Sequence, residues 1–241
     1  MGDAPEADED EVGLDPEKCT IYVNPVAHGW SETWCGCPVA FWGADGQLYS
    51  PVAYVKATQG AYADTLYRPD QNTRVTMDVT VRGEMEYWFG CWTNDYNRGA
   101  FCLGNDGEWG IYFAVCDDGG SFFHDGGRVP TGRHMVELTP WEFKVDGTIW
   151  AAKPESSRKD FQIDLPLYLF AQNRKGSAFV NAEQGTITCH GCTISENGSL
   201  KRKFVPSCRE SDGAYGFYDA VEGAFYGNRG SGMLYGPKDM K

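Results

Sequence analysis

The sequence lacks a long hydrophobic run and an excess of basic residues. A membrane-spanning helix needs about 18 or more consecutive apolar residues, and no stretch of this chain reaches that length. Lys and Arg number 21 against 34 Asp and Glu, so the formal net charge is −13 at pH 7. Because proteins that bind nucleic acid through its phosphates need a basic face, we expect neither nucleic acid as a partner nor insertion into a membrane.

The first 18 residues have no hydrophobic period. They hold eight acidic residues and one lysine, and we expect them to form a disordered acidic tail. A secretory signal needs a basic region followed by an apolar one, and this acidic start has neither. The sequence therefore predicts either a protein that does not use the usual secretory route or a leader that is absent from this chain.

Amphipathic helical patterns are also missing, and short runs typical of strands take their place. Residues 73–81 alternate β-branched and polar side chains, as a half-buried strand does. Compact aromatic and aliphatic runs occupy residues 87–92, 100–103, 109–115 and 165–171. Turn residues separate them, and Asp146-Gly147 is a hairpin signal. The pattern predicts an all-β fold, a two-sheet antiparallel β-sandwich of the jelly-roll type.

Nine cysteines are many for a reduced cytosolic protein, and their odd number leaves at least one thiol without a disulfide partner. Two close pairs, Cys35 with Cys37 and Cys189 with Cys192, could together hold zinc, with His190 as a further ligand. We expect disulfides or buried thiols in preference to a metal, and the sequence leaves the pairing open.

Residues 19–50 are rich in cysteine and tryptophan and contain several turn signals. Linkers are not this aromatic, so we expect a small N-terminal cap that precedes the sandwich. Trp30, Trp34 and Trp42 could pack on the sandwich or form an exposed patch for a protein partner or for self-association. Packing is the expected arrangement.

Three segments resemble parts of a known family. Residues 54–65 read YVKATQGAYADT, residues 192–208 run from CTISENG to FVPSC, and residues 216–232 read GFYDAVEGAFYGNRGSG. They resemble the opening, the penultimate strand and the closing signature of concanavalin A-like lectin/glucanase domains of the laminin-G-like kind. Such domains occur in surface and secreted proteins of gut bacteria and in phage-associated proteins. The resemblance covers about residues 51–238.

This resemblance implies a jelly-roll domain over residues 51–241, and a location outside the cell, at a cell surface or on a virion. It implies function only loosely, because the fold carries lectins, adhesion modules, glycanases and structural modules.

Catalytic signatures are missing from the sequence. Retaining glucanases of this fold carry Glu-x-Asp-x-x-Glu on one strand, and the nearest approach here is Glu84-Met85-Glu86. No Gly-x-Ser-x-Gly nucleophile and no glycine-rich phosphate loop occur. Asp106, Glu108 and Asp125 could still meet across strands, which keeps a divergent glycanase as the third hypothesis. We expect no enzymatic activity.

The region from Trp88 to Trp109 combines aromatic rings with amide, carboxylate and guanidinium groups. A lectin site needs an apolar platform for the C–H face of a sugar and polar groups for its hydroxyls. The predicted ligand-binding residues are Trp92, Asn94, Asp95, Tyr96, Arg98 and Trp109. Strand alternation places Trp88 and Trp92 on one face and Tyr87, Phe89 and Cys91 on the other, so one set is expected to face the core.

Calcium is the one cofactor that the sequence leaves open. Oxygen ligands for it could come from Asp95, Asn97, Asn105 and Asp106, and laminin-G-like relatives often hold one calcium in this loop. Short clusters of Asp and Asn are more often turns.

The first functional hypothesis is a non-enzymatic binding module that recognises a glycan or a surface glycoprotein. Adhesion at a cell or virion surface would be its setting. The alternative is a structural or assembly module without a small ligand.

Overall fold

The computed structural model describes residues 15, 19–23, 33–82, 86–93, 99–106, 110–117, 120–122, 127–158, 160, 163–180 and 187–237. For residues 86, 106, 110–117, 120–122 and 157 it describes the backbone alone. Within these ranges the regular structure is made of β-strands, apart from one short 3-10 helix, η1 (Glu155–Ser157). The all-β prediction is confirmed. No helix among these residues is long and apolar enough to cross a membrane.

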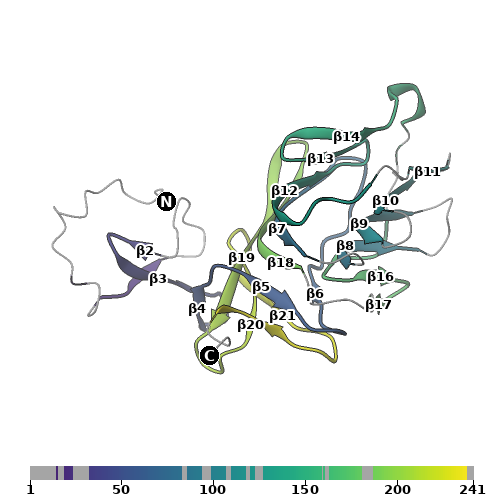
Figure 1. The fold of residues 1–241 in the computed structure, drawn as a ribbon. Helices are drawn as coiled ribbons and strands as arrows, with labels where there is room; N and C mark the ends of the chain where they lie inside the picture. Colours follow the sequence, from purple (N-terminus) through teal and green to yellow (C-terminus); the bar gives the residue numbers. More distant parts are fainter. Residues whose placement is uncertain are drawn as a thin grey trace.

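The described strands form two sheets that pack face to face as a sandwich (Figure 1). The larger sheet has the strand order β1 (Ile21–Val23), β3 (Cys37–Trp42), β4 (Leu48–Pro51), β19 (Ser199–Arg209), β18 (Thr188–Glu196), β7 (Thr73–Val81), β12 (Gly132–Leu138), β13 (Glu142–Val145) and β14 (Thr148–Ala152). Five further strands attach to this path: β2 (Thr33–Trp34) to β3, β20 (Tyr215–Asp219) to β19, β21 (Ala224–Gly227) to β20, β5 (Val55–Ala57) to β18, and β22 (Leu234–Tyr235) to β5.

The smaller sheet has the order β11 (Gly120–Phe122), β10 (Gly110–Asp117), β9 (Ala100–Asp106), β8 (Glu86–Trp92), β15 (Tyr168–Leu169) and β6 (Ala63–Asp64). A hairpin of β16 (Gln172–Arg174) and β17 (Ser177–Phe179) joins it through parallel pairing of β16 with β8. The two-sheet β-sandwich predicted from the sequence is therefore present.

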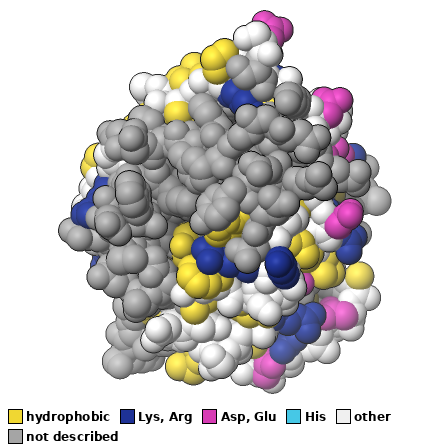
Figure 2. Space-filling view, turned by 90° about the vertical axis from the view of Figure 1, so that its right-hand side faces the viewer, with side chains coloured by type: hydrophobic (Ala, Val, Ile, Leu, Met, Phe, Trp, Pro, Cys, Tyr) yellow, Lys and Arg dark blue, Asp and Glu magenta, His cyan; other side chains and the backbone are white. Residues whose placement is uncertain are grey.

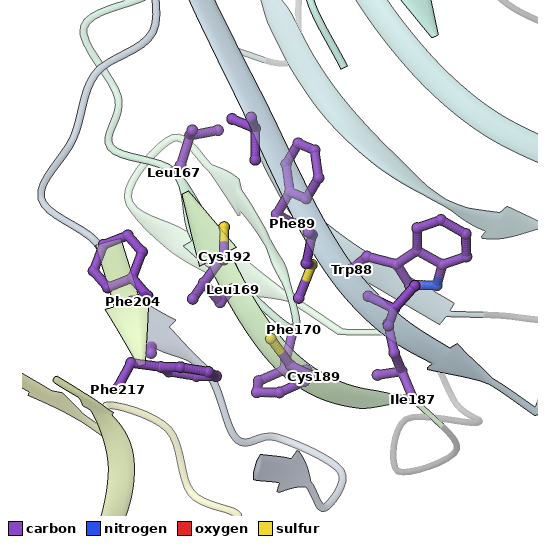
Figure 3. Close-up of a cluster of buried hydrophobic side chains, with 14 of the residues drawn as sticks. Trp88, Phe89, Leu167, Leu169, Phe170, Ile187, Cys189, Cys192, Phe204 and Phe217 are labelled. Atoms are coloured by element: carbon purple, nitrogen blue, oxygen red, sulfur yellow. The ribbon is translucent and has the colours of Figure 1, made fainter. Parts of the chain in front are cut away.

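The core lies between the two sheets (Figure 3). Trp88 and Phe89 point into it from the smaller sheet, and Cys189, Cys192 and Phe204 meet them from the larger sheet. All five side chains are at most 3% exposed. Burial of this much apolar surface is the main force that holds the sheets together.

Two local predictions are confirmed in detail. Strand β7 has the predicted bounds, and its residues alternate between buried and more exposed positions along their length. The hairpin between β13 and β14 turns at Asp146 and Gly147, which both have positive φ (50° and 77°). Positive φ at both central residues is the geometry of the type I′ turn that Asp-Gly favours.

The predicted alternation in β8 is wrong. Phe89 pairs with Leu103 and Tyr87 with Gly104, so Trp88 is an extra residue with no opposite partner on β9. This bulge brings Trp88 into the same core cluster as Phe89, while Trp92 lies in a separate cluster with Ala100 and Cys102. An inserted residue shifts every following side chain to the other face.

The N-terminal cap continues the larger sheet. Strands β2 and β3 project from one side of the sandwich in Figure 1, and β3 reaches β19 through β4. A second small core forms here, in which Phe41 and Tyr49 pack against Tyr218. Trp34 packs against this cluster as expected. Trp42 does not, since it is 48% exposed.

Trp30 lies outside the described residues. Eight of the nine cysteines are described with their side chains, none of these eight is in a disulfide, and most of them are buried. Cys189 and Cys192 belong to the sandwich core, which agrees with the buried-thiol expectation. Both ring nitrogens of His190 are engaged, one with the Thr80 hydroxyl at 2.9 Å and one with the Ala53 carbonyl at 2.9 Å.

Candidate functional site

The loop at residues 228–233 interlocks with the loop at residues 58–62. The amide nitrogen of Asn228 donates to the carbonyls of Gly230 (3.1 Å) and Gly232 (2.6 Å). Its side-chain oxygen accepts from the backbone N–H groups of Tyr62 (3.2 Å) and Gly230 (3.0 Å). The side chain of Asn228 thus uses both of its donors and accepts twice, which fixes the loop that leads into β22.

A groove with a volume of about 880 Å³ opens beside this interlock. It lies between the loops that follow β19 and β21 and the start of β22. Its lining residues are Thr58, Arg209, Gly213, Ala214, Tyr215, Phe225, Gly227, Asn228, Arg229, Met233, Leu234 and Tyr235. We call it the end groove. A volume in this range is typical of small-molecule binding sites.

Aromatic rings form much of the end groove. Tyr215 and Leu234 are buried, and Phe225 is half-buried. The ring of Phe225 stacks on Tyr49 with a centroid separation of 4.7 Å. The guanidinium of Arg209 lies 5.5 Å from the centroid of the Phe225 ring. This places a charged donor group next to an apolar surface.

A bidentate ion pair fixes Arg209. Its Nε and Nη2 donate to the two carboxylate oxygens of Asp212 at 2.9 and 2.6 Å. These hydrogen bonds lower the pKa of Asp212 to about 2. Beneath the ring of Phe225, burial and a 2.6 Å hydrogen bond to Asp45 raise the pKa of Tyr49 to about 12. Both ionisable groups therefore keep a single charge state across the neutral range.

Arg229 is different, because its guanidinium has no hydrogen bond or ion pair with any described residue. Its backbone N–H donates to the Tyr62 carbonyl at 2.9 Å, which anchors the residue while its exposed side chain stays available at the rim. Met233 beside it is 66% exposed. The groove thus offers guanidinium donors and an apolar floor.

No Asp or Glu is among the described lining residues of the end groove. A glycosidase needs two carboxyl groups about 5 to 10 Å apart across the scissile bond. Such a pair of carboxyl groups is not present among the described lining residues. Glu84, Glu108 and Asp125, which sequence reasoning considered for this chemistry, lie outside the described residues.

None of the described lining residues of the end groove is a ligand-binding residue predicted from the sequence. Asn94, Asp95, Tyr96, Arg98 and Trp109 fall outside the described residues. Trp92 is described and is 4% exposed, so its ring is covered.

Next to Trp92, the guanidinium of Arg174 lies 4.6 Å from the Trp92 ring centroid and 3.4 Å from that of Phe179. Phe179 is 41% exposed. Figure 2 shows the side of the molecule on which β16 and β17 lie, and there basic side chains lie beside hydrophobic ones.

The calcium prediction falls mostly outside the described residues. Asp95 and Asn97 are not described, and for Asp106 only the backbone is. Asn105 is 1% exposed. In the part of the chain that the structure describes, no group of three or more His, Cys, Asp or Glu side chains is arranged to hold a metal ion.

A smaller pocket of about 460 Å³ lies at another place on the surface. Its lining residues are Gln71, Asn72, Thr73, Arg74, Thr139, Pro140, Trp141, Glu142, Arg158, Asn197 and Gly198. Arg158 lies 5.9 Å from the ring centroid of Trp141. Arg158 is exposed and lines this pocket, as Arg229 is exposed and lines the end groove, and Arg158 therefore provides a matched control for Arg229.

Sequence reasoning missed the end groove, because its walls come from segments that are far apart in the chain. The signal that could have indicated it is the run Asn228-Arg229-Gly230, in which a basic residue stands between two loop-forming ones. No protein-family model matches the chain and no curated protein matches it, so the resemblance to laminin-G-like domains stays a prediction.

Proposed function

We propose that the protein is a non-enzymatic carbohydrate-binding module and that the end groove holds the sugar. One observation carries the proposal. The guanidinium of Arg209 is fixed over the Phe225 ring, and the guanidinium of Arg229, which has no partner among the described residues, lies on the rim of the same 880 Å³ groove.

Sugar chemistry fits this arrangement. A pyranose ring has apolar C–H faces that pack on aromatic and thioether side chains such as Phe225 and Met233. Its hydroxyl oxygens accept hydrogen bonds, and each guanidinium carries five N–H donors in a planar fork. Because Asp212 already holds Arg209 in place, little conformational entropy is lost when a ligand binds to it.

The loop residues predicted from the sequence, Tyr96 above all, remain a second proposed contact surface. Recognition of a glycan or a surface glycoprotein at a cell or virion surface is the proposed setting. This setting is supported by the resemblance of the two ends of the domain to laminin-G-like modules.

A glycan-array screen of the folded chain, with and without calcium, tests the proposal. Wild-type protein is compared with Arg229→Ala, with Tyr96→Ala and with Arg158→Ala as the matched control. We expect a discrete set of bound sugars whose binding falls at least tenfold in Arg229→Ala and is unchanged in Arg158→Ala. If folded wild-type protein binds nothing under either condition, the proposal is wrong.

The alternative, an assembly module, has one observation in its favour. Tyr22 and Trp42 are 56% and 48% exposed on the projecting cap, and their ring centroids are 6.2 Å apart. Exposed aromatic pairs are common at protein interfaces. Two results would favour this function. Sedimentation velocity would show a stable oligomer that the Trp42→Ala substitution dissociates, and the glycan array would show no sugar binding.

A further inference from the structure

Three thiols converge in the cap. Strand β1 pairs in parallel with β3, with Ile21 opposite Val39. Strand β1 begins at Ile21 and β3 at Cys37, and the same register continued two residues before β1 puts Cys19 level with Cys37. Neighbouring strands are about 4.8 Å apart, which is within the Cα separation of 4.4 to about 6.8 Å that a disulfide needs.

The third thiol belongs to a tight turn. Trp34 pairs with Cys37, so Cys35 and Gly36 form a two-residue hairpin loop. Both have positive φ, 49° and 74°, as a type I′ turn requires. The turn holds Cys35 close enough to Cys37 for the two thiols to interact electrostatically.

Cys19 and Cys37 lie close together and differ in access to solvent. Burial, together with the interaction with the Cys19 thiol, raises the pKa of the Cys37 thiol. Cys37 is fully buried, whereas Cys19 is partly exposed. A dissolved oxidant therefore meets Cys19 first.

We propose that Cys19 and Cys37 are a thiol–disulfide exchange site that forms an intramolecular disulfide. The oxidant is a small-molecule disulfide such as glutathione disulfide. The Cys19 thiolate attacks one sulfur of the oxidant, which forms a mixed disulfide and releases one small thiol. The Cys37 thiolate then attacks the Cys19 sulfur, and the second small thiol leaves with the remaining proton. The protein loses two hydrogen atoms, and one oxidant molecule becomes two thiols.

The bond would tie β1 to β3. Among the described residues, three pairs join these strands, so a disulfide would add a covalent link to a short strand pairing. It carries Tyr22, which lies beside Trp42. A disulfide at this position fixes the exposed aromatic pair and makes its arrangement dependent on the redox state. This inference does not depend on the proposed sugar binding.

Four other described thiols are less suited to thiol–disulfide exchange than Cys19 and Cys37. Cys91, Cys102, Cys189 and Cys192 are at most 3% exposed, and burial strongly raises the thiol pKa of Cys91 and Cys192. Cys37 is buried as well, but it has to react only with the neighbouring Cys19 sulfur, whereas these four thiols would have to meet the dissolved oxidant themselves. We therefore expect these cysteines to stay reduced while the cap is oxidised.

Peptide mapping of the full chain tests the proposal. Reduced protein is equilibrated with glutathione disulfide, alkylated, and cleaved after Lys18, Glu32 and Lys56. This separates Cys19 from Cys35 and Cys37, because residues 19–32 and 33–56 become different peptides. Before alkylation, we expect the intact mass of the oxidised protein to be about 2 Da lower than that of the reduced protein. After cleavage, we expect these two peptides to be linked, and we expect the same link in Cys35→Ser.

The link between the two peptides must disappear in Cys19→Ser. Because Cys19 is partly exposed, this variant should fold even if Cys37→Ser, at a buried position, does not. Hydrogen exchange at β1 must slow after oxidation of wild-type protein and stay unchanged in Cys19→Ser. The proposal is overturned by a bond between Cys35 and Cys37, by a link that Cys35→Ser abolishes, or by folded protein that stays fully reduced. Native mass spectrometry that finds the three thiols bound to zinc would also overturn it.

Discussion

The side-chain oxygen of Asn228 accepts a hydrogen bond from the backbone N–H of Tyr62 at 3.2 Å, although 166 positions separate the two residues. This bond joins the segment that resembles the opening of a laminin-G-like domain to the segment that resembles its closing signature. It also positions Arg229 on the rim of the end groove. The geometry of the groove therefore depends on a contact between the two ends of the sandwich domain.

The Gly230→Ala variant is expected to be less stable than the wild-type protein. A Cβ at residue 230 would lie 1.7 Å from the carbonyl oxygen of Gly60, so one of the two loops must move. We expect a loss of about 2 to 3 kcal/mol in the free energy of unfolding, measured in urea. Gly191→Ala is the control, since its Cβ would meet the nearest atom at an ordinary 3.7 Å. Equal losses in both variants would contradict the interlock.

Asp219 is a buried carboxylate with a structural role. It is fully buried, and its Oδ1 accepts from the backbone N–H groups of Lys203 (2.9 Å) and Val221 (3.0 Å). Asp219→Ala leaves both donors unpaired and should cost about 2 to 4 kcal/mol. Asp219→Asn keeps the acceptor and should cost less.

The same carboxyl gives a pH dependence of defined sign. Burial raises the pKa of Asp219 above 3.8, so in the folded state the group takes up a proton at higher pH than in the unfolded state. The penalty of the buried charge is present above the folded pKa and is relieved as pH falls through it. Relative to Asp219→Asn, wild-type protein should gain stability as pH falls towards 3.8. A constant difference in unfolding free energy across that window would contradict this.

Asp212 should titrate in the opposite direction. Hydrogen bonds from Arg209 lower its pKa from 3.8 to about 2, so the ion pair stabilises the fold above 3.8 and loses its effect as pH falls through about 2. Carboxyl carbon shifts in NMR measure this value directly. In Arg209→Ala the pKa of Asp212 should return towards 3.8. A pKa that stays near 2 would mean that Arg209 does not hold this carboxylate.

Trp92→Ala should destabilise the protein strongly. The ring is 4% exposed, and truncation of a buried Trp typically costs about 3 to 5 kcal/mol. Arg174→Ala should cost about 1 kcal/mol, because it removes a cation–π contact with an intact core around it. Thermal unfolding distinguishes the two variants. A loss of sugar binding in Trp92→Ala is meaningful only when the variant is shown to be folded.

Much of the fold could be predicted because strand periodicity acts locally. Alternation gave the bounds of β7, and an Asp-Gly pair gave the β13–β14 turn. The arrangement of β8 could not be predicted, since alternation assumes one residue for each partner and Trp88 is an inserted residue. Exposure of Trp42 was missed for another reason. Composition indicates that a tryptophan prefers burial, but not whether the neighbouring elements leave it a place.

The end groove could not be predicted from the sequence, in contrast to much of the fold. Thr58, Arg209 and Arg229 line one groove, yet nothing in their separate sequence neighbourhoods indicates that they meet. Their meeting depends on the pairing of β5 with β22 and on the Asn228 interlock. The sequence did indicate the loop from Asn94 to Arg98, whose composition is typical of a binding loop and which lies outside the described residues.

The location of the sugar is tested most directly by hydrogen–deuterium exchange with and without the best ligand from the array. We expect slower exchange in peptides that cover residues 209–235, with the largest change around Arg229, and none in Arg229→Ala. Protection confined to peptides from residues 86–106, with residues 209–235 unchanged, would contradict sugar binding in the end groove and would assign it to the loop region predicted from the sequence.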